Sequence, residues 1–229
     1  ADGCAVRRSR CAGPPPGSAL RPSRGAGAPP KGAARRAYGR GVPTLLLLNG
    51  PSGVGKSTLA ALWAREADAA CLDPDRLRAD LPEAASTAAM QAARARTLEL
   101  AATALSNGRD VVVAQLCARP EFPDALRETA IRAQANYVEV LLVDSVAHLH
   151  RRLAQRATSA EAHHRLAHAA LDLDELESVH AALVDRAAAD PRVEVLRCGE
   201  GQEDITLRAI DQLVTTAAVP HAPTKRAPG

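Results

Sequence analysis

Residues 44–58 read TLLLLNGPSGVGKST, an apolar segment that runs directly into a glycine-rich loop. The loop has the pattern G-x-x-x-x-G-K-[ST] and is followed by helix-like sequence, which is the context that this pattern requires. Gly50, Gly53 and Gly55 let the backbone curl so that consecutive N–H groups point at phosphate oxygens, whose approach a side chain would obstruct. The stretch therefore predicts a strand, a phosphate-binding loop and a helix in succession.

Two side chains of the loop have the chemistry that a bound nucleotide needs. Lys56 reaches the β- and γ-phosphates, Ser57 offers a hydroxyl to Mg²⁺, and the helix that begins near Lys56 directs the positive end of its dipole at the anion. A glycine-rich turn without a ligand would leave the lysine and the hydroxyls without a role. We therefore expect ATP and Mg²⁺ to bind here. The expected nucleotide-binding residues are Gly50, Pro51, Ser52, Gly53, Val54, Gly55, Lys56, Ser57 and Thr58.

The first 43 residues differ from the rest in composition. They carry nine Arg or Lys and one Asp, a formal charge of +8, so the chain total of +3 leaves −5 for residues 44–229. Because it is rich in Pro and Gly and has few apolar residues to bury, we expect segment 1–43 to be a disordered basic tail. A nucleic-acid or membrane-surface arm and an organelle transit segment are alternatives, but amphipathic periodicity is missing and Tyr38 is its one aromatic residue. Residues 219–229 are expected to form a second disordered tail.

Between the tails, residues 44–218 alternate short apolar runs with longer Ala-, Leu- and Arg-rich stretches. This alternation predicts one three-layer domain with a parallel sheet and crossover helices. The predicted strands are 44–49, 69–72, 110–116, 137–143 and 193–197. The predicted helices are 56–67, 86–106, 121–135, 145–158, 173–188 and 203–217. Candidate N-cap residues are Ser86 or Thr87 for the second helix and Asp144 or Ser145 for the fourth.

The string CLDPDRLR, residues 71–78, follows the second predicted strand. It lies at the carboxyl end of a parallel strand, the edge where open α/β sheets bind ligands. A carboxylate here can accept the proton of an attacking alcohol, and an Arg can hold an anionic part of the acceptor. An Asp-Pro-Asp turn that caps a short helix explains the same residues without a ligand. The phosphate loop one strand away favours the functional interpretation.

With these two motifs the chain resembles the small-molecule kinases of the P-loop superfamily, the adenylate-kinase-like group. LDPDRLR looks like the L-D-G-D-x-x-R segment of adenylylsulfate kinases, and similar acid-x-acid segments occur in gluconate kinases, zeta toxins, chloramphenicol phosphotransferases and a broad set of bacterial ATP-binding proteins. The resemblance implies that Asp75 is the base, that Arg78 binds the acceptor and that Asp73 lies near Mg²⁺. Pro74 stands where the pattern has Gly. The implied fold is α/β, a three-layer P-loop NTPase with a five-stranded parallel sheet in the order 2-3-1-4-5 and helices on both faces.

The resemblance extends to LHRRLAQR, residues 149–156. In these kinases the helix after the fourth strand leads into a lid whose Arg residues close over the phosphates. Arg152 and Arg156 are four residues apart, hence on one helical face, and resemble the R-x-x-x-R lid signature. A solvated basic face on a surface helix is the alternative. The residues expected to act in catalysis are therefore Lys56, Asp75, Arg152 and Arg156.

A second acid follows an apolar run, VEVLLVD at residues 138–144, and would indicate a motor or switch ATPase if Asp144 held Mg²⁺. In the kinase-like order, however, the third strand neighbours the loop, and its end carries Gln115, which can hydrogen-bond the water shell of the metal or the acceptor. Asp144 is then expected to be a helix cap. A GTPase is not favoured, since no N-K-x-D motif follows the loop.

The prediction is therefore an ATP-dependent phosphotransferase that acts on a hydroxyl of a small molecule. The alternative is a non-catalytic or hydrolytic ATP-binding regulatory protein. The sequence does not indicate the acceptor or the oligomeric state. A nucleic-acid partner is not expected, although the basic tail leaves this possibility open.

No run approaches the roughly 20 apolar residues that a membrane helix needs, and no segment has the layout of a secretory signal. The chain is therefore expected to be cytoplasmic, with no membrane partner. Five cysteines without metal-ligand spacing argue against a disulfide framework and a zinc site. Cys71, Cys117 and Cys198 each close an apolar run and are expected to be small buried residues.

Overall fold

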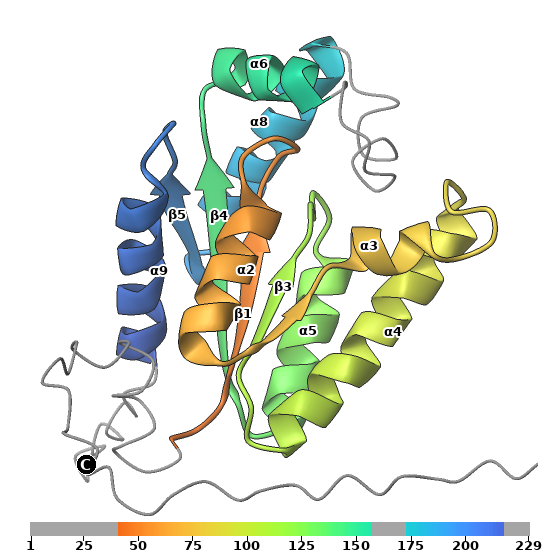
Figure 1. The fold of residues 1–229 in the computed structure, drawn as a ribbon, viewed down its shortest axis with the longest axis vertical. Coiled ribbons are helices and arrows are strands. Elements are labelled where there is room, and N and C mark those ends of the chain that lie inside the picture. The colour runs from red at the N-terminus through yellow and green to blue at the C-terminus, as the bar shows by residue number, and fades with distance from the viewer. Residues whose placement is uncertain (1–40, 157–172, 218–229) are drawn as a thin grey trace, which may run out of the picture.

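The computed structural model describes residues 41–156 and 173–217, and Figure 1 shows how their elements are arranged. The strands are β1 (Thr44–Asn49), β2 (Ala70–Leu72), β3 (Val111–Ala114), β4 (Asn136–Val143) and β5 (Val193–Arg197). The helices are α2 (Lys56–Ala67), α3 (Pro74–Ala79), α4 (Thr87–Ser106), α5 (Glu121–Arg132), α6 (Val146–Arg156), α8 (Leu173–Ala189) and α9 (Glu203–Ala217). The predicted tails, 1–43 and 219–229, lie outside the described residues except for 41–43.

The five strands form one parallel sheet in the order β2-β3-β1-β4-β5, which confirms the predicted topology. β1 is the central strand, and its Leu46 pairs with Val112 on one side and Val138 on the other. All six residues of β1 are buried, because helices cover both faces of the sheet. The loop after β1 therefore emerges in the middle of the carboxyl edge, where ligands bind in this kind of sheet.

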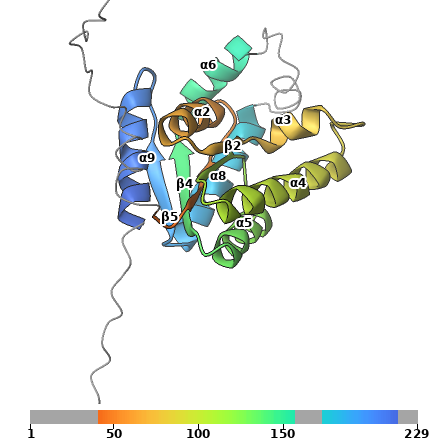
Figure 2. The same cartoon turned by 60° about the horizontal axis from the view of Figure 1, so that its bottom comes forward.

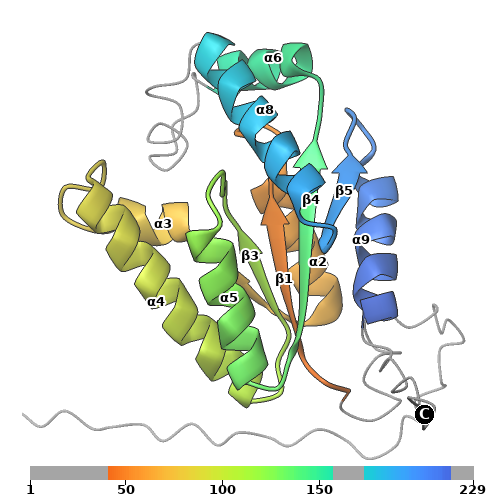
Figure 3. The same cartoon turned by 180° about the vertical axis from the view of Figure 1, so that it is seen from behind.

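The two faces of the sheet pack against different helices, because successive side chains of a strand point to opposite faces. Leu46 packs among side chains of α2 and α9, including Trp63. Leu47 packs among side chains of α4 and α5, and Leu183 of α8 packs against β4. Figures 2 and 3 show the resulting layers, with α2 and α9 on one face and α4, α5 and α8 on the other.

The acid-rich string after β2 forms the short helix α3, which the predicted element list lacked. Asp73 caps it, since its Oδ1 accepts the backbone N–H groups of Asp75 at 3.0 Å and Arg76 at 3.4 Å. Pro74 is the first helical residue, where its fixed φ and missing N–H are favourable. The interpretation of this string as a capped short helix is therefore confirmed, and it leaves the second carboxylate oxygen of Asp73 for other contacts.

Several predicted element ends shift by a few residues. β3 ends at Ala114 rather than at 116, so Gln115 lies just beyond the strand, and α5 ends at Arg132 rather than at 135. The N-cap of α4 is Ser86, whose hydroxyl accepts the N–H of Ala89 at 3.0 Å. Element types persist because they depend on long patterns, whereas ends depend on single local hydrogen bonds.

Cys117 and Cys198 are buried as predicted, but Cys71 is exposed and that prediction was wrong. It lies in β2, the short edge strand, whose neighbouring residues are only partly buried. Across the described ranges, no helix combines the length and the hydropathy that crossing a membrane requires.

Candidate nucleotide and acceptor site

The loop after β1 has a backbone that demands glycine at two positions. Gly50 has a φ of 150°, and a Cβ atom there would lie 2.5 Å from the carbonyl oxygen of Leu142. Gly55 has a φ of 101° and is the N-cap of α2. Because the loop enters α2 at its N-terminus, backbone N–H groups that lack intrahelical partners face the space above it. The geometry fits a cradle for phosphate.

Lys56 lies against this loop rather than in solvent. Its Nζ donates hydrogen bonds to the carbonyl oxygens of Gly50 at 2.8 Å and Pro51 at 2.9 Å. The ammonium group is thereby held next to the N–H groups of the loop, where a phosphate oxygen would meet both. This is the position that the sequence pattern predicts for the lysine.

The two predicted metal ligands are in direct contact. Ser57, in the first turn of α2, donates its hydroxyl to Oδ2 of Asp73 at 2.8 Å. Mg²⁺ commonly takes one or two protein ligands and completes its shell with water and substrate phosphates. A hydroxyl and a carboxylate beside a phosphate loop fit that ion. Within the described part of the chain, no three His, Cys, Asp or Glu residues gather as a metal site.

The residues predicted for proton abstraction and acceptor binding also meet. Asp75 Oδ1 lies 3.2 Å from Nη2 of Arg78, and Gln115 Nε2 donates to Asp75 Oδ2 at 3.5 Å. Burial raises the pKa of the Asp75 carboxyl above its usual range, and the positive charge of Arg78 offsets part of that rise. A carboxylate with a raised pKa is a better proton acceptor, so the environment of Asp75 suits a general base.

The predicted lid arginines are described only in part. α6 lies across the carboxyl edge of the sheet (Figure 1), with Leu149 and Leu153 buried beneath it. Arg152 lies over the phosphate loop, with Nη1 3.5 Å from the carbonyl oxygen of Gly53. Arg156 is the last residue of α6. Its side chain and the lid predicted beyond it lie outside the described residues.

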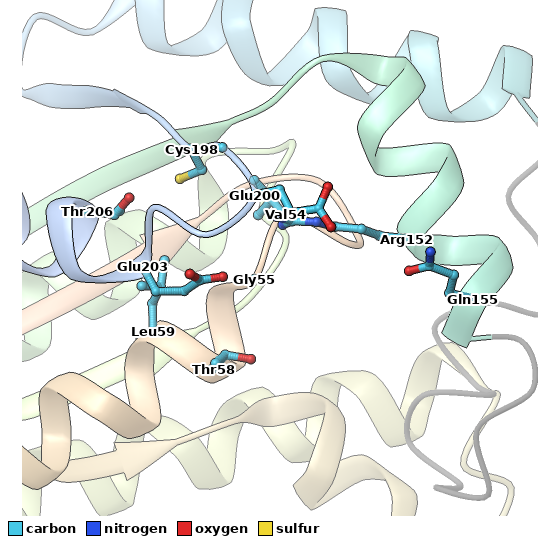
Figure 4. A pocket seen from close by; sticks show the side chains of 11 residues that line it. Val54, Gly55, Thr58, Leu59, Arg152, Gln155, Cys198, Glu200, Glu203 and Thr206 are labelled. Atoms are coloured by element: carbon cyan, nitrogen blue, oxygen red, sulfur yellow. The ribbon is translucent and has the colours of Figure 1, made fainter.

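A pocket of about 290 Å³ opens beside the phosphate loop, on the side of α2 away from α3. Figure 4 shows it between α6, which supplies Arg152, and the segment that joins β5 to α9, which supplies Cys198 and Glu200. Burial raises the pKa of the Cys198 thiol to about 11, so the thiol is neutral near pH 7. The lining residues are Val54, Gly55, Thr58, Leu59, Arg152, Gln155, Cys198, Gly199, Glu200, Glu203 and Thr206. Apart from the loop residues and Arg152, the sequence analysis identified none of them as site residues.

The sequence analysis also missed the anchor of the phosphate loop. The side chain of Asn49 accepts the N–H groups of Gly50 and Cys117, both at 2.8 Å, and donates to the carbonyl oxygen of Cys117 at 3.1 Å. It also donates to the buried carboxylate of Glu139 at 3.3 Å. An acid in the buried run 138–143 was a signal that could have indicated such a network, because buried carboxylates require partners.

Asp144 was the competing candidate for the metal. Its Oδ1 accepts the N–H of Ser145 at 2.7 Å and lies 3.1 Å from His148 Nδ1. The predicted capping contact comes from Ser145, whose hydroxyl accepts the N–H of His148 at 3.3 Å. Within residues 41–156 and 173–217, no hydrogen bond given by the structure joins Asp144 to Ser57. The geometry therefore favours Asp73 as the acid beside the phosphate loop.

A family model described as an AAA domain, AAA_33, matches residues 45–176 of this chain. The match covers more than half of the sequence and includes the phosphate loop, α3 and α6. The chain belongs to this AAA domain family. A comparison with curated proteins found no match.

Several solved structures with the same fold as this AAA domain are small-molecule kinases. A gluconokinase from Sinorhizobium meliloti is 19% identical with a TM-score of 0.53, and the alignment covers 77% of this chain and 94% of that one. The APS kinase of Mycobacterium tuberculosis, solved with AMPPNP and APS, is 20% identical with a TM-score of 0.53, covering 76% and 99%. A shikimate kinase from Bacteroides thetaiotaomicron is 19% identical with a TM-score of 0.51, covering 75% and 98%. The predicted membership of the P-loop kinase superfamily is confirmed at the level of the fold.

Proposed function

We propose that this AAA domain transfers the γ-phosphate of ATP to a hydroxyl group of a small molecule. The observation that carries the proposal is the 2.8 Å hydrogen bond between Ser57 in the phosphate loop and Asp73. It brings the turn that contains Asp75 against the loop, near the end where a γ-phosphate would lie. A partly buried carboxylate at that end supports transfer to an alcohol over nucleotide binding alone.

The surroundings of α2 suggest how ATP would lie. The pocket lies beside Arg152 and the β5–α9 segment. Figure 1 shows that segment and α3 on opposite sides of α2. Val54 and Leu59 offer the pocket apolar surface, and Glu200 and Glu203 offer acceptors for an exocyclic amine. We infer that the base occupies this pocket and that the triphosphate runs along the loop toward Asp73.

In the transfer step, the acceptor hydroxyl attacks the γ-phosphorus and loses its proton to the carboxylate of Asp75. A new bond forms between the acceptor oxygen and phosphorus, the bond to the β-bridging oxygen breaks, and ADP leaves. Lys56 and Arg152 lie where they would neutralise charge on the transferring group. Ser57 and Asp73 would hold Mg²⁺, which supplies further positive charge to the phosphate oxygens when bound.

ADP release above the water background tests the proposal, with Mg·ATP and a panel of hydroxylated metabolites, nucleosides and aminoglycoside-like or phenicol-like antibiotics. We expect at least one acceptor to raise ADP release. Lys56→Ala should abolish ATP binding or turnover, and circular dichroism should show that its fold is intact. Turnover retained by Lys56→Ala would contradict the assignment of the loop.

One observation favours a second candidate, a regulatory domain that binds ATP without transferring phosphate. Gln115, at the end of β3 next to the phosphate loop, is neutral and donates to Asp75 instead of offering a second carboxylate to a metal. In the same assay, tight Mg·ATP binding with no acceptor-dependent ADP release would support this candidate.

A further inference from the structure

Arg94 is partly buried and forms no ion pair with any of the described residues. It extends from α4 and lies over Phe122 at the start of α5, with its guanidinium carbon 5.0 Å from the ring centroid. Its Nε atom is buried and has no hydrogen-bond partner. Across the described ranges, no acidic side chain forms an ion pair with it. A guanidinium withdrawn from water without an anion is unfavourable, and stacking on an aromatic ring offsets only part of the cost.

Two neighbours of Asp75 show the same deficit. Arg78 uses Nη2 to contact Asp75, but its Nε is buried without a partner. Gln115 is 3% exposed and donates through Nε2, while its Oε1 accepts no hydrogen bond. Buried polar groups are normally hydrogen-bonded, so two unmet donors and one unmet acceptor together indicate a site prepared for a ligand.

These three side chains surround the same place in the fold. Helices α3 and α4, which supply Arg78 and Arg94, lie next to each other beside the end of β3 (Figures 1 and 3). Arg94 lies over Phe122, and Phe122 packs in the same buried cluster as Cys117, two residues beyond Gln115. Arg94 is therefore close to the residues that follow β3, and its helix packs against the helix that contains Asp75 and Arg78.

The charge balance around Asp75 favours an anion. Arg78 and Arg94 bring two positive charges, and the Asp75 carboxylate supplies one negative charge that Arg78 already contacts. A neutral polyol would satisfy hydrogen bonds but would leave the second guanidinium without a counter-charge. A carboxylate, sulfate or phosphate would satisfy the unmet donors and the charge together.

We propose that Arg78 and Arg94 hold an anionic group of the acceptor, so that the substrate is a hydroxylated anion and not a neutral alcohol. This inference rests on the proposed function, since it concerns the acceptor of the same site. The hydroxyl to be phosphorylated faces Asp75, and Gln115 Oε1 accepts a hydrogen bond from a second hydroxyl. Arg94 thus acts in acceptor recognition, a role that no motif in the sequence predicts.

The test observes the two arginines directly. With ¹⁵N-arginine-labelled protein loaded with Mg·AMPPNP, the Nε–Hε signals of Arg78 and Arg94 are followed by NMR while sodium acetate or sodium sulfate is added, against sodium chloride at matched ionic strength. We expect both signals to shift saturably with at least one of the two anions. A response to acetate indicates a carboxylate on the acceptor, and a response to sulfate indicates a sulfate or phosphate. If neither anion moves either signal, the inference is wrong.

Variants on α4 supply the control. Arg94→Gln should weaken anion affinity at Arg78 by about tenfold or more, the effect of losing one charge-assisted contact. Arg96→Gln should not change it, because Arg96 is exposed and pairs with Glu99 at 2.8 Å. Unchanged affinity in Arg94→Gln would overturn the inference, and if that variant does not fold, the wild-type titration decides. AMPPNP binding is measured on the same sample. If AMPPNP does not bind, the proposed function is wrong, whereas the arginine signals test anion binding on the acceptor side independently.

Discussion

Arg186 of α8 donates a 2.7 Å hydrogen bond to Glu139 of β4, whose side chain is 1% exposed. The same carboxylate accepts from Asn49 at 3.3 Å and from the hydroxyl of Tyr137 at 3.1 Å. Asn49 in turn holds the first N–H of the phosphate loop. One buried acid therefore connects a helix on the surface of the sheet with the loop that we expect to bind ATP.

Arg186→Leu should destabilise the fold, because it removes the closest cation from a fully buried carboxylate. The expected loss is about 3 kcal/mol in the free energy of unfolding, the lower end of the range for breaking a buried pair, since Arg127 remains 3.9 Å away. Urea denaturation measures the change. The matched control is Arg192→Leu, an exposed residue paired with Asp190, for which the loss should be much smaller because surface ion pairs contribute little. Equal losses in the two variants would show that the Glu139 network contributes no more to the free energy of unfolding than a surface ion pair does.

Asn49→Ala should weaken Mg·ATP binding, because the N–H of Gly50 loses its acceptor and the loop loses its tie to Cys117. We expect the dissociation constant to rise by about tenfold, the equivalent of one buried hydrogen bond to a polar group. Isothermal titration calorimetry measures it. Asn107→Ala, at the end of α4 and away from the loop, should bind as the wild type does. An unchanged constant in Asn49→Ala would mean that the loop keeps its shape without this side chain.

Asp75→Asn should still bind ATP but lose phosphoryl transfer by about a hundredfold or more, the usual scale for a general base. Steady-state kinetics with an identified acceptor measure the loss, which should fall mainly on kcat. Asp80→Asn, at the end of the same short helix, is the control and should keep its rate. A normal rate in Asp75→Asn would place the base elsewhere.

The stability of the protein should depend on pH through Asp75. Burial raises the pKa of Asp75 in the folded state above its pKa in the unfolded chain, so the folded state binds the proton more tightly. The free energy of unfolding therefore decreases as the pH rises from the unfolded-state pKa through the folded-state pKa. Removing the charge should relieve this loss, so Asp75→Asn should melt at the same temperature as the wild type or higher near pH 7. Differential scanning calorimetry of both proteins, from acidic to neutral pH, checks the sign. A clearly lower melting temperature for Asp75→Asn at pH 7 would contradict it.

Nucleotide should protect Cys198 from alkylation, because that thiol lines the pocket in which we expect the base to lie. The reaction should be slow even without nucleotide, since the pKa of the thiol is about 11 and little thiolate is present near pH 7. Mass spectrometry of the peptide that contains Cys198 measures the rate with and without Mg·AMPPNP. Equal rates would indicate that the base lies outside this pocket.

The local motifs were predictable from the sequence because their chemistry depends on neighbouring residues. The glycines at 50 and 55 have the positive φ angles that the loop pattern implies. The alternation of apolar and Ala-rich segments correctly predicted five strands, since a strand buried on both faces requires a continuous apolar run. Their order was implied by the resemblance to P-loop kinases and not by the alternation. Asp73, which follows β2, contacts Ser57 because the carboxyl ends of parallel strands share one edge.

Only the tertiary structure decided which distant side chains meet. Glu139 bonds to Asn49 across 90 residues of sequence and to Arg186 across 47, and Arg94 stacks on Phe122 from a helix that no motif marks. Such contacts depend on how whole helices pack on the sheet. That packing also decides which charged side chains become buried at the edge of the sheet. A pattern of residue types along the chain carries information about periods and turns, but the partner of a buried charge is determined only when the helices pack on the sheet.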